Sequence, residues 1–342
     1  MKKHLLFAVV LAIAGTLNAE DLIMEEYFEA GAGEPLIADT ITKSDNFNPV
    51  TGWSSVANSG SGLTCFYIQD TVLTYEGYAG SGQGHTLAFR PNKMAGQSVF
   101  KNFDKGIKND STIYIAFMIQ FLKDTQDYES PDYFMGIKIE PAATSTNYTG
   151  RIYATVQSQS ESGESYEGEE ITMTILKASN GESVSDQSNY LTFDQTYLMV
   201  FKYHVGVLNG KTADEEAGHY DDEMWLYVNP SLDQEPAEAN IYSLDPNGRD
   251  GYRISGSGKE MGSLRGFYLR GGEPGKANRI NPYLLGGVRI GFTWEDVIGP
   301  QEQKEGLEET ESAASVTKKI RDGQLLILRN GKEYSAQGSQ LK

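Results

Sequence analysis

The segment from Tyr197 to Pro230 constrains the fold of this chain more than any other. It opens with the apolar run Tyr197–Val205, crosses a polar and acidic loop, and returns through Glu223–Val228. In the returning run Met, Leu and Val alternate with Trp and Tyr, which is the two-residue period of a strand with two different faces. Asn229-Pro230 ends the pairing, because proline lacks a backbone N–H and restricts the residue before it. The segment therefore predicts two strands of a sheet.

The clearest single strand signal lies at Thr112–Phe121. One face carries Ile113, Ile115, Phe117, Ile119 and Phe121, and the other carries Tyr114, Ala116, Met118 and Gln120. Because both faces are largely apolar, we expect this strand to lie in the centre of a sheet that is covered on both sides.

Further short runs with the same alternation follow along the chain, separated by turn residues. No segment shows a sustained period of 3.6 residues, so a parallel α/β sheet is not expected. The pattern predicts an all-β chain, a two-sheet antiparallel β-sandwich. The additional expected strands are Thr64–Gln69, Val72–Tyr75, Thr86–Arg90, Tyr133–Glu140, Gly150–Gln157, Glu170–Lys177 and Gly262–Arg270.

Several of these runs resemble one known family. The strand LMVFKY, the segment LYVNPSLDQEPAEA and the closing run VRIGFTWEDV (Val288–Val297) are similar to the concanavalin A-like, or laminin-G-like, domains of secreted bacterial proteins. The resemblance implies a lectin-like jelly roll. It extends to Glu26–Phe28 and Leu73–Tyr78, and so covers most of the chain.

The chain divides into four parts by composition. Residues 1–19 have a basic start, an apolar run and a small-residue end, which is typical of a signal peptide and too short for the roughly 20 residues of a membrane span. Residues 20–298 form the expected sandwich. Residues 299–316 are acidic and lack aromatic side chains, which indicates a linker. Residues 317–342 are β-like again.

The last part predicts a short β-hairpin tail. Leu326 and Leu328 alternate with Leu325 and Ile327, and Asn330-Gly331 is a strong hairpin turn. The run resembles short C-terminal modules of secreted Bacteroidetes proteins, which are related to sorting domains of type IX secretion. That resemblance implies secretion machinery as a partner, while a hairpin that merely docks on the sandwich is the alternative. We expect a secreted or cell-surface protein.

Charge limits the class of partner. The formal net charge is −18, and loss of Lys2 and Lys3 with the signal makes the mature chain more acidic still. Such a surface repels nucleic acid, and no later stretch is apolar enough to be an integral membrane segment. Cys65 is the one cysteine, so the fold has no internal disulfide, and we expect the thiol to be a small buried group.

Candidate catalytic residues are scarce. Retaining glucanases of this fold place two carboxyl groups about 5–5.5 Å apart, by the spacing Glu-x-Asp on one strand face. That spacing does not occur here. The reversed spacing occurs at Asp214/Glu216, Asp221/Glu223 and Asp233/Glu235, where solvated surface charge is the simpler interpretation. Binding is therefore favoured over catalysis, with a glycan hydrolase or lyase using unusual carboxylates as an alternative.

Two kinds of binding site remain. No cofactor is expected, but calcium is left open, because laminin-G-like domains often hold it in an acidic rim loop; Asp221 and Asp222 are the candidate ligands. Trp53, Tyr78 and Tyr283 are placed in loops, where an aromatic ring could stack on a sugar face. The sequence thus favours a noncatalytic protein that binds carbohydrate. A structural or adhesin-like surface protein is the other alternative.

Overall fold

The computed structural model describes most of the expected sandwich and part of the tail. The described residues are 22–37, 47–56, 64–90, 96–107, 110–123, 132–140, 148–159, 165–176, 184–185, 191–205, 222–243, 263–272, 279–299, 317–321, 324–329 and 332–335. The expected signal peptide and the linker up to residue 316 lie almost wholly outside this set, so both stay predictions. The chain divides into two units, Met1–Gly299 and Pro300–Lys342, which are described separately.

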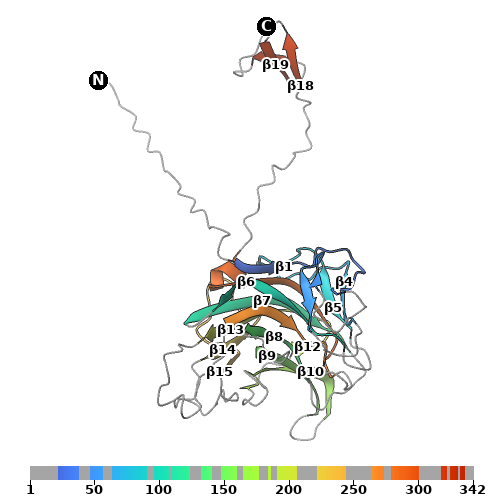
Figure 1. Cartoon of the computed structure of the whole chain (residues 1–342), viewed down its shortest axis with the longest axis vertical. Helices are drawn as coiled ribbons and strands as arrows, with labels where there is room; N and C mark the ends of the chain where they lie inside the picture. Colours follow the sequence, from blue (N-terminus) through green and yellow to red (C-terminus); the bar gives the residue numbers. More distant parts are fainter. Residues whose placement is uncertain are drawn as a thin grey trace, which may run out of the picture. The chain divides into compact units, whose positions relative to one another are not determined.

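Two antiparallel sheets make up the first unit, in which strands dominate (Figure 1). Sheet A has the order β15 (Ile241–Ser243), β14 (Glu223–Val228), β13 (Thr196–Val205), β7 (Ser111–Phe121), β17 (Tyr283–Gly291), β5 (Thr86–Phe89) and β4 (Phe66–Gln69), and β1 (Leu22–Glu26) also pairs with β17. Sheet B has the order β11 (Val184–Ser185), β10 (Ser165–Leu176), β9 (Tyr148–Gln159), β8 (Tyr133–Glu140), β16 (Ser263–Leu269), β6 (Val99–Ile107), β3 (Trp53–Ser55) and β2 (Phe47–Asn48), and β12 (Leu191–Thr192) pairs with β10. The expected all-β sandwich is confirmed.

Strand β7 is the central strand of sheet A, as its two apolar faces predict. It pairs with β13 from Gln120↔Thr196 to Ser111↔Val205 and with β17 on its other side. His204 on β13 lies 3.0 Å from the hydroxyl of Thr112 through Nδ1, which makes it a hydrogen-bonded strand residue. Strand β13 in turn pairs with β14, so the two runs around the 206–221 segment are neighbours in one sheet.

The main core lies between the two sheets. The rings of Phe121 on β7 and Phe134 on β8 meet edge to face at 5.8 Å, which joins sheet A to sheet B. Cys65 is buried in the same core, as expected for a small apolar group. Because side chains alternate along each strand, every second one is buried between the sheets. Each Å² of apolar surface that is removed from water there stabilises the folded state by roughly 25 cal/mol.

The closing motif forms a strand followed by a capped helix. Strand β17 ends at Gly291, and Thr293 caps helix α2 (Trp294–Ile298) through a capping box with Asp296. Arg289 reaches from β17 to the carboxylate of Glu25, to the Tyr27 hydroxyl at 3.0 Å and to the Asp296 carbonyl oxygen at 2.9 Å. These contacts tie β1, β17 and α2 together, so the residues of the motif serve the fold.

One expected strand is absent, and one long strand was not expected. The run Val72–Tyr75 is not a strand, although its residues alternate. Conversely, β6 was not predicted, because Lys101, Asp104 and Lys105 interrupt its apolar pattern. Strand β6 forms nevertheless, since β16 and β3 supply backbone partners on both of its sides.

The second unit is a small antiparallel sheet. Strands β19 (Gln324–Arg329) and β20 (Lys332–Ser335) form the expected hairpin, and β18 (Thr317–Arg321) adds a third strand beside β19. The prediction of a two-stranded tail is therefore corrected to three strands. Within the described residues of the whole chain, no helix is long and apolar enough to cross a membrane.

Candidate functional site

Trp53 lies in the core and is not available to a ligand. It belongs to β3 rather than to a loop, and its side chain is 0% exposed. Its ring lies 6.3 Å from that of Phe28 and 6.1 Å from that of Phe267, and its Nε1 donates to the Glu26 carboxylate at 2.8 Å. The pairing of β3 with β6 places this ring between the sheets, which the polar sequence around it did not indicate.

Tyr78 and Tyr283 are also buried, so the assignment of these rings to a ligand is corrected as well. The Tyr78 hydroxyl donates to the Gly287 carbonyl oxygen at 2.5 Å and fixes its loop to β17. Tyr283 opens β17, and its ring stacks on that of Phe89 at 5.1 Å. Tyr283 lies in the core between the sheets, and Tyr78 packs in the apolar cluster that includes Leu73 and Trp294.

Of the two candidate calcium ligands, the structure describes Asp222. Asp221 lies outside the described residues, and Asp222 is buried, with the Tyr203 hydroxyl donating to its Oδ2 at 2.6 Å. The described residues contain no group of three or more His, Cys, Asp or Glu side chains arranged to hold a metal ion. Asp222 therefore serves as a hydrogen-bond acceptor at the start of β14.

The outer face of sheet A is closed by packing. Helix α2 lies on it, with the Trp294 ring 6.3 Å from that of Tyr114 and 5.3 Å from that of Tyr227. Leu73 and Tyr78 from one loop and Leu232 from another join the same apolar cluster. This face is a second small core and does not offer an open surface at its centre.

Glu235 fastens one of these covering loops to sheet A. Its carboxylate accepts from Tyr114 Oη, Tyr227 Oη and Lys202 Nζ, each at 2.7 Å. Its interpretation as solvated charge is therefore wrong. Burial alone would raise the pKa of Glu235, but the hydrogen bonds from Lys202, Tyr227 and Tyr114 outweigh burial, and the pKa is lowered.

This network predicts an acid-sensitive loop. A carboxyl group whose pKa is lowered by folding stabilises the protein above its unfolded pKa, and this stability is lost as the pH falls through the folded value. We expect Glu235→Gln to lower the free energy of unfolding by about 1 kcal/mol at neutral pH, discounted for partial exposure. In urea titrations the deficit should shrink as the pH falls below the ordinary pKa of a glutamate, through the lowered pKa of Glu235. Glu238→Gln, an exposed change in the same loop, should show no such trend.

The outer face of sheet B carries a cluster of aromatic rings on four neighbouring strands. Its members are Phe100 on β6, Tyr133 on β8, Tyr148 and Tyr153 on β9, and Tyr268 on β16. Tyr148 and Tyr268 stack with their centres 3.7 Å apart, and Tyr133 lies 5.7 Å from Tyr153 and 6.0 Å from Tyr268. Tyr153 is partly exposed and the other rings are buried, so Tyr153 is the accessible ring of the cluster.

Cationic side chains lie against these rings. The guanidinium carbons of Arg151 and Arg270 are 4.7 and 4.8 Å from the centre of the same Tyr133 ring, and Lys138 Nζ is 3.5 Å from the centre of Phe100. All three side chains are partly exposed. Cations attracted to ring faces in this way contribute about 0.5–2 kcal/mol each. This aromatic and cationic surface, which we call the B-face platform, is the candidate functional site.

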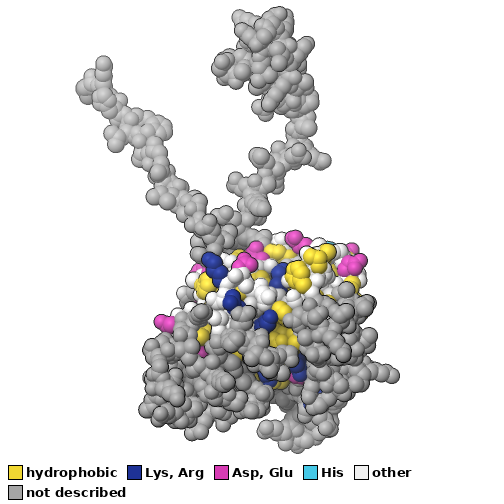
Figure 2. Space-filling model, in the orientation of Figure 1, with side chains coloured by type: hydrophobic (Ala, Val, Ile, Leu, Met, Phe, Trp, Pro, Cys, Tyr) yellow, Lys and Arg dark blue, Asp and Glu magenta, His cyan; other side chains and the backbone are white. Residues whose placement is uncertain are grey.

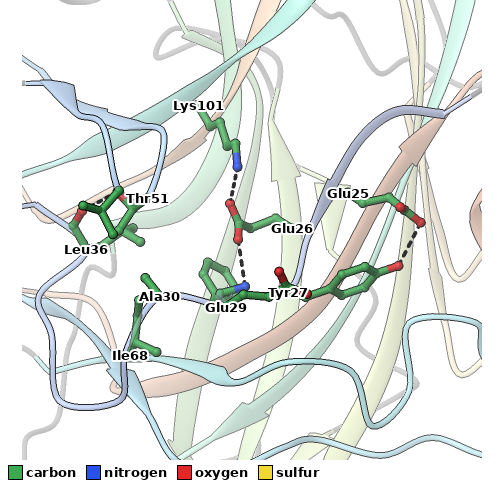
Figure 3. Close-up of a pocket in the computed structure, with 11 residues that line it drawn as sticks. Glu25, Glu26, Tyr27, Glu29, Ala30, Leu36, Thr51, Ile68 and Lys101 are labelled. Atoms are coloured by element: carbon green, nitrogen blue, oxygen red, sulfur yellow. Dashed lines mark hydrogen bonds and ion pairs between the residues drawn. The ribbon is translucent and has the colours of Figure 1, made fainter.

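A separate pocket of about 420 Å³ lies beside β1, lined by acidic and apolar side chains (Figure 3). Glu26 points to Lys101 there and accepts its Nζ at 2.6 Å as well as the Phe28 N–H at 2.7 Å and the Trp53 indole. Glu25 lies beside Tyr27 and is paired with Arg289. Glu25 and Glu26 are thus paired with cations of the same chain. We therefore assign these two carboxylates a structural role and do not choose this pocket as the candidate functional site.

Sequence reasoning missed every residue of the B-face platform. Tyr133 and Arg151 stand in runs that were correctly expected to be strands, but alternation cannot tell the core face of a strand from its outer face when both carry rings. The one available signal was Arg151-Ile-Tyr153, in which a cation and a ring share a face two residues apart.

The sequence matches no model of a protein family, and no curated protein matches it. A comparison with solved structures does give matches. A glucuronan lyase from the fungus Trichoderma reesei is 10% identical, with coverage of 75% of this chain and 98% of that chain and a TM-score of 0.40. The globular domain of T. cruzi calreticulin is 9% identical, covers 79% and 88%, and has a TM-score of 0.34. The lumenal domain of VIP36, bound to Ca²⁺ and mannose, is 9% identical, covers 67% and 84%, and has a TM-score of 0.32.

The two sheets by themselves define the fold of the first unit, which is an antiparallel β-sandwich.

Proposed function

We propose that this protein binds a glycan on the B-face platform without chemically altering it. The observation that carries the proposal is the placement of rings from β6, β8, β9 and β16 on one outer face, where Tyr153 and the cationic side chains of the platform are partly exposed. An exposed ring offers an apolar face to a sugar ring, and the neighbouring polar groups can bond its hydroxyls. The closed outer face of sheet A offers no comparable surface at its centre.

The ionisation of the platform supports binding over elimination. A lyase needs a base to remove a proton from the sugar, and a tyrosinate is the candidate base here. Burial raises the pKa of Tyr133 and of Tyr153, and the charges of the neighbouring arginines oppose this effect without overcoming it. Both hydroxyls are therefore protonated at neutral pH, and that of the partly exposed Tyr153 is suited to donate a hydrogen bond to a ligand.

Hydrolysis is not supported by the carboxylate on this face. Asp132 accepts from Arg270 Nε at 2.9 Å and is only 10% exposed, so it is committed to an ion pair. A general acid needs a raised pKa and access to the glycosidic oxygen. Asp132 instead compensates one of the two guanidinium charges.

Substitution of the accessible ring tests the proposal. We expect saturable binding of the full-length protein to at least one polysaccharide on a glycan array, and Tyr153→Ala should weaken it about tenfold, equivalent to about 1.4 kcal/mol. Tyr242→Ala removes a ring that is 44% exposed on β15 of the other sheet, and it should leave affinity unchanged.

Two results would reject the proposal. An array without any saturable binding would remove its basis. Equal losses in Tyr153→Ala and Tyr242→Ala, each checked for folding by circular dichroism, would place binding elsewhere than on the B-face platform.

A further inference from the structure

We infer that the ligand of the B-face platform is an acidic polysaccharide whose sugar carboxylates are bound by Arg151, beside the ion-paired Arg270. This inference rests on the proposed function and narrows its ligand class. Basic, acidic and hydrophobic side chains are interspersed on the part of the surface that is coloured in Figure 2, while the whole chain carries a formal net charge of −18. On so acidic a protein, a pair of cations held over one ring indicates a local role for positive charge.

The first step is the geometry of the two arginines. Both guanidinium groups lie within 5 Å of the centre of the Tyr133 ring, one from β9 and one from the end of β16. The buried ring holds them through cation–π attraction and restricts their movement. A guanidinium whose flat face packs on a ring still has N–H donors along its edge. Two of these donors can form parallel hydrogen bonds with the two oxygens of a carboxylate.

The second step is the charge balance of the pair. Arg270 is compensated by Asp132 at 2.9 Å. Arg151 has no ion pair with a carboxylate of the described residues, and its Nε has no hydrogen-bond partner there, since its contacts are to the Tyr133 ring and to Tyr153. One unit of positive charge is therefore left uncompensated within the described part of the platform, beside the partly exposed ring of Tyr153.

The third step is the extent of the platform. Lys138 adds a cation over Phe100 and lies 3.4 Å from Asn102 Oδ1, so positive charge continues toward β6. Strands β9, β8, β16 and β6 are consecutive neighbours in sheet B, and three inter-strand spacings of about 4.8 Å make the platform roughly 15 Å wide. Because four of the five rings are at most 5% exposed, the groups that a ligand can contact along this width are Tyr153 and the partly exposed cationic side chains.

The acidity of the whole protein does not prevent this binding. At physiological ionic strength charges are screened beyond about 8 Å, so groups on the platform dominate the field that a bound carboxylate meets. The long-range field instead slows the approach of any polyanion at low salt. A sulfate ester is also an anion whose oxygens a guanidinium fork can bind, so the test includes a sulfated polymer to distinguish it from a carboxylate.

The test uses the full-length protein and three forms of one polymer: a polyuronate, its carboxyl-reduced neutral form, and a sulfated derivative of that neutral form. We expect the polyuronate to bind at least tenfold more tightly than the other two in isothermal titration. Arg151→Gln should weaken polyuronate binding at least tenfold and leave binding of the neutral form unchanged. Arg151→Lys should be intermediate, because it keeps the charge but loses the fork.

Arg90→Gln is the matched control, because Arg90 also lies over a tyrosine ring, that of Tyr67, at 5.9 Å on sheet A. It should not change the affinity for the polyuronate. Unchanged binding of the neutral polymer by Arg151→Gln also shows that this variant is folded.

The outcomes separate this inference from the proposed function. Equal affinity for the neutral and charged polymers would overturn the inference while glycan binding stands. Tighter binding of the sulfated form would overturn the choice of carboxylate. Equally tight binding of a single-stranded oligonucleotide would overturn the glycan as the anion carrier. Failure of all three polymers to bind would count against the proposed function itself.

Discussion

Trp53→Ala is expected to lower the free energy of unfolding by about 3–5 kcal/mol, the usual cost of truncating a fully buried tryptophan. The ring fills the core between Phe28 and Phe267, so its removal leaves a cavity between the sheets. The change also leaves the buried carboxylate of Glu26 without one of its donors, which adds a desolvation cost. Native domains are stable by about 5–15 kcal/mol, so this single change removes a large part of the total.

Urea unfolding followed by tryptophan-independent far-ultraviolet circular dichroism measures this effect. Phe47→Ala is the matched control, because Phe47 lies on the neighbouring strand β2 but is 62% exposed, and its loss should change stability by less than about 0.5 kcal/mol. A Trp53→Ala protein of wild-type stability would show that the ring is not part of the core. Glycan binding by the folded fraction should be unchanged.

Gly84→Ala is expected to be at least as damaging, with a loss of more than about 3 kcal/mol. Gly84 has φ of +55°, in the left-handed region that side chains disfavour, and a Cβ at this position would overlap the carbonyl group of Tyr27. That carbonyl also accepts the N–H of His85 at 2.8 Å, so it cannot move away without breaking a backbone hydrogen bond. The close approach joins the loop before β5 to the residue that follows β1.

Gly82→Ala separates the clash from the backbone strain. Gly82 has φ of +69°, but a Cβ there would have no neighbour within 4 Å. We expect it to cost only about 1–2 kcal/mol, the price of placing an alanine in the left-handed region. Thermal and urea unfolding of both variants give the comparison. Equal losses would show that the contact with Tyr27 has no energetic weight, and a Gly84→Ala chain that is insoluble beside a folded Gly82→Ala chain supports the clash.

The fold could be predicted because it depends on local patterns that repeat along the chain. The two apolar faces of Thr112–Phe121 placed β7 in the centre of a sheet, and the returning run Glu223–Val228 became β14 beside β13. The motif from Val288 to Val297 predicted a strand followed by a cap, and the structure has β17 followed by α2. Where charges interrupted the pattern, as in β6, prediction failed.

The candidate site could not be predicted, because burial of a ring depends on strands that are distant in sequence. Trp53 stands among polar residues and turns, which favoured a surface loop, yet β6 and β16 enclose it. Glu235 stands in an acidic segment, yet Tyr114 and Lys202 come from strands more than 30 residues away to bind it. In each case the local composition was uninformative about the partner.

The sequence by itself determined the class of this protein, since an alternating pattern without helical periodicity can bury its apolar side chains only between two sheets. It also determined the acidity and the absence of an internal disulfide. Only the tertiary structure decided what lies on each outer face, by laying α2 on sheet A and by bringing Tyr133, Arg151 and Arg270 together on sheet B. The physical reason is that strand pairing, which places these residues side by side, is set by contacts between segments far apart in the chain.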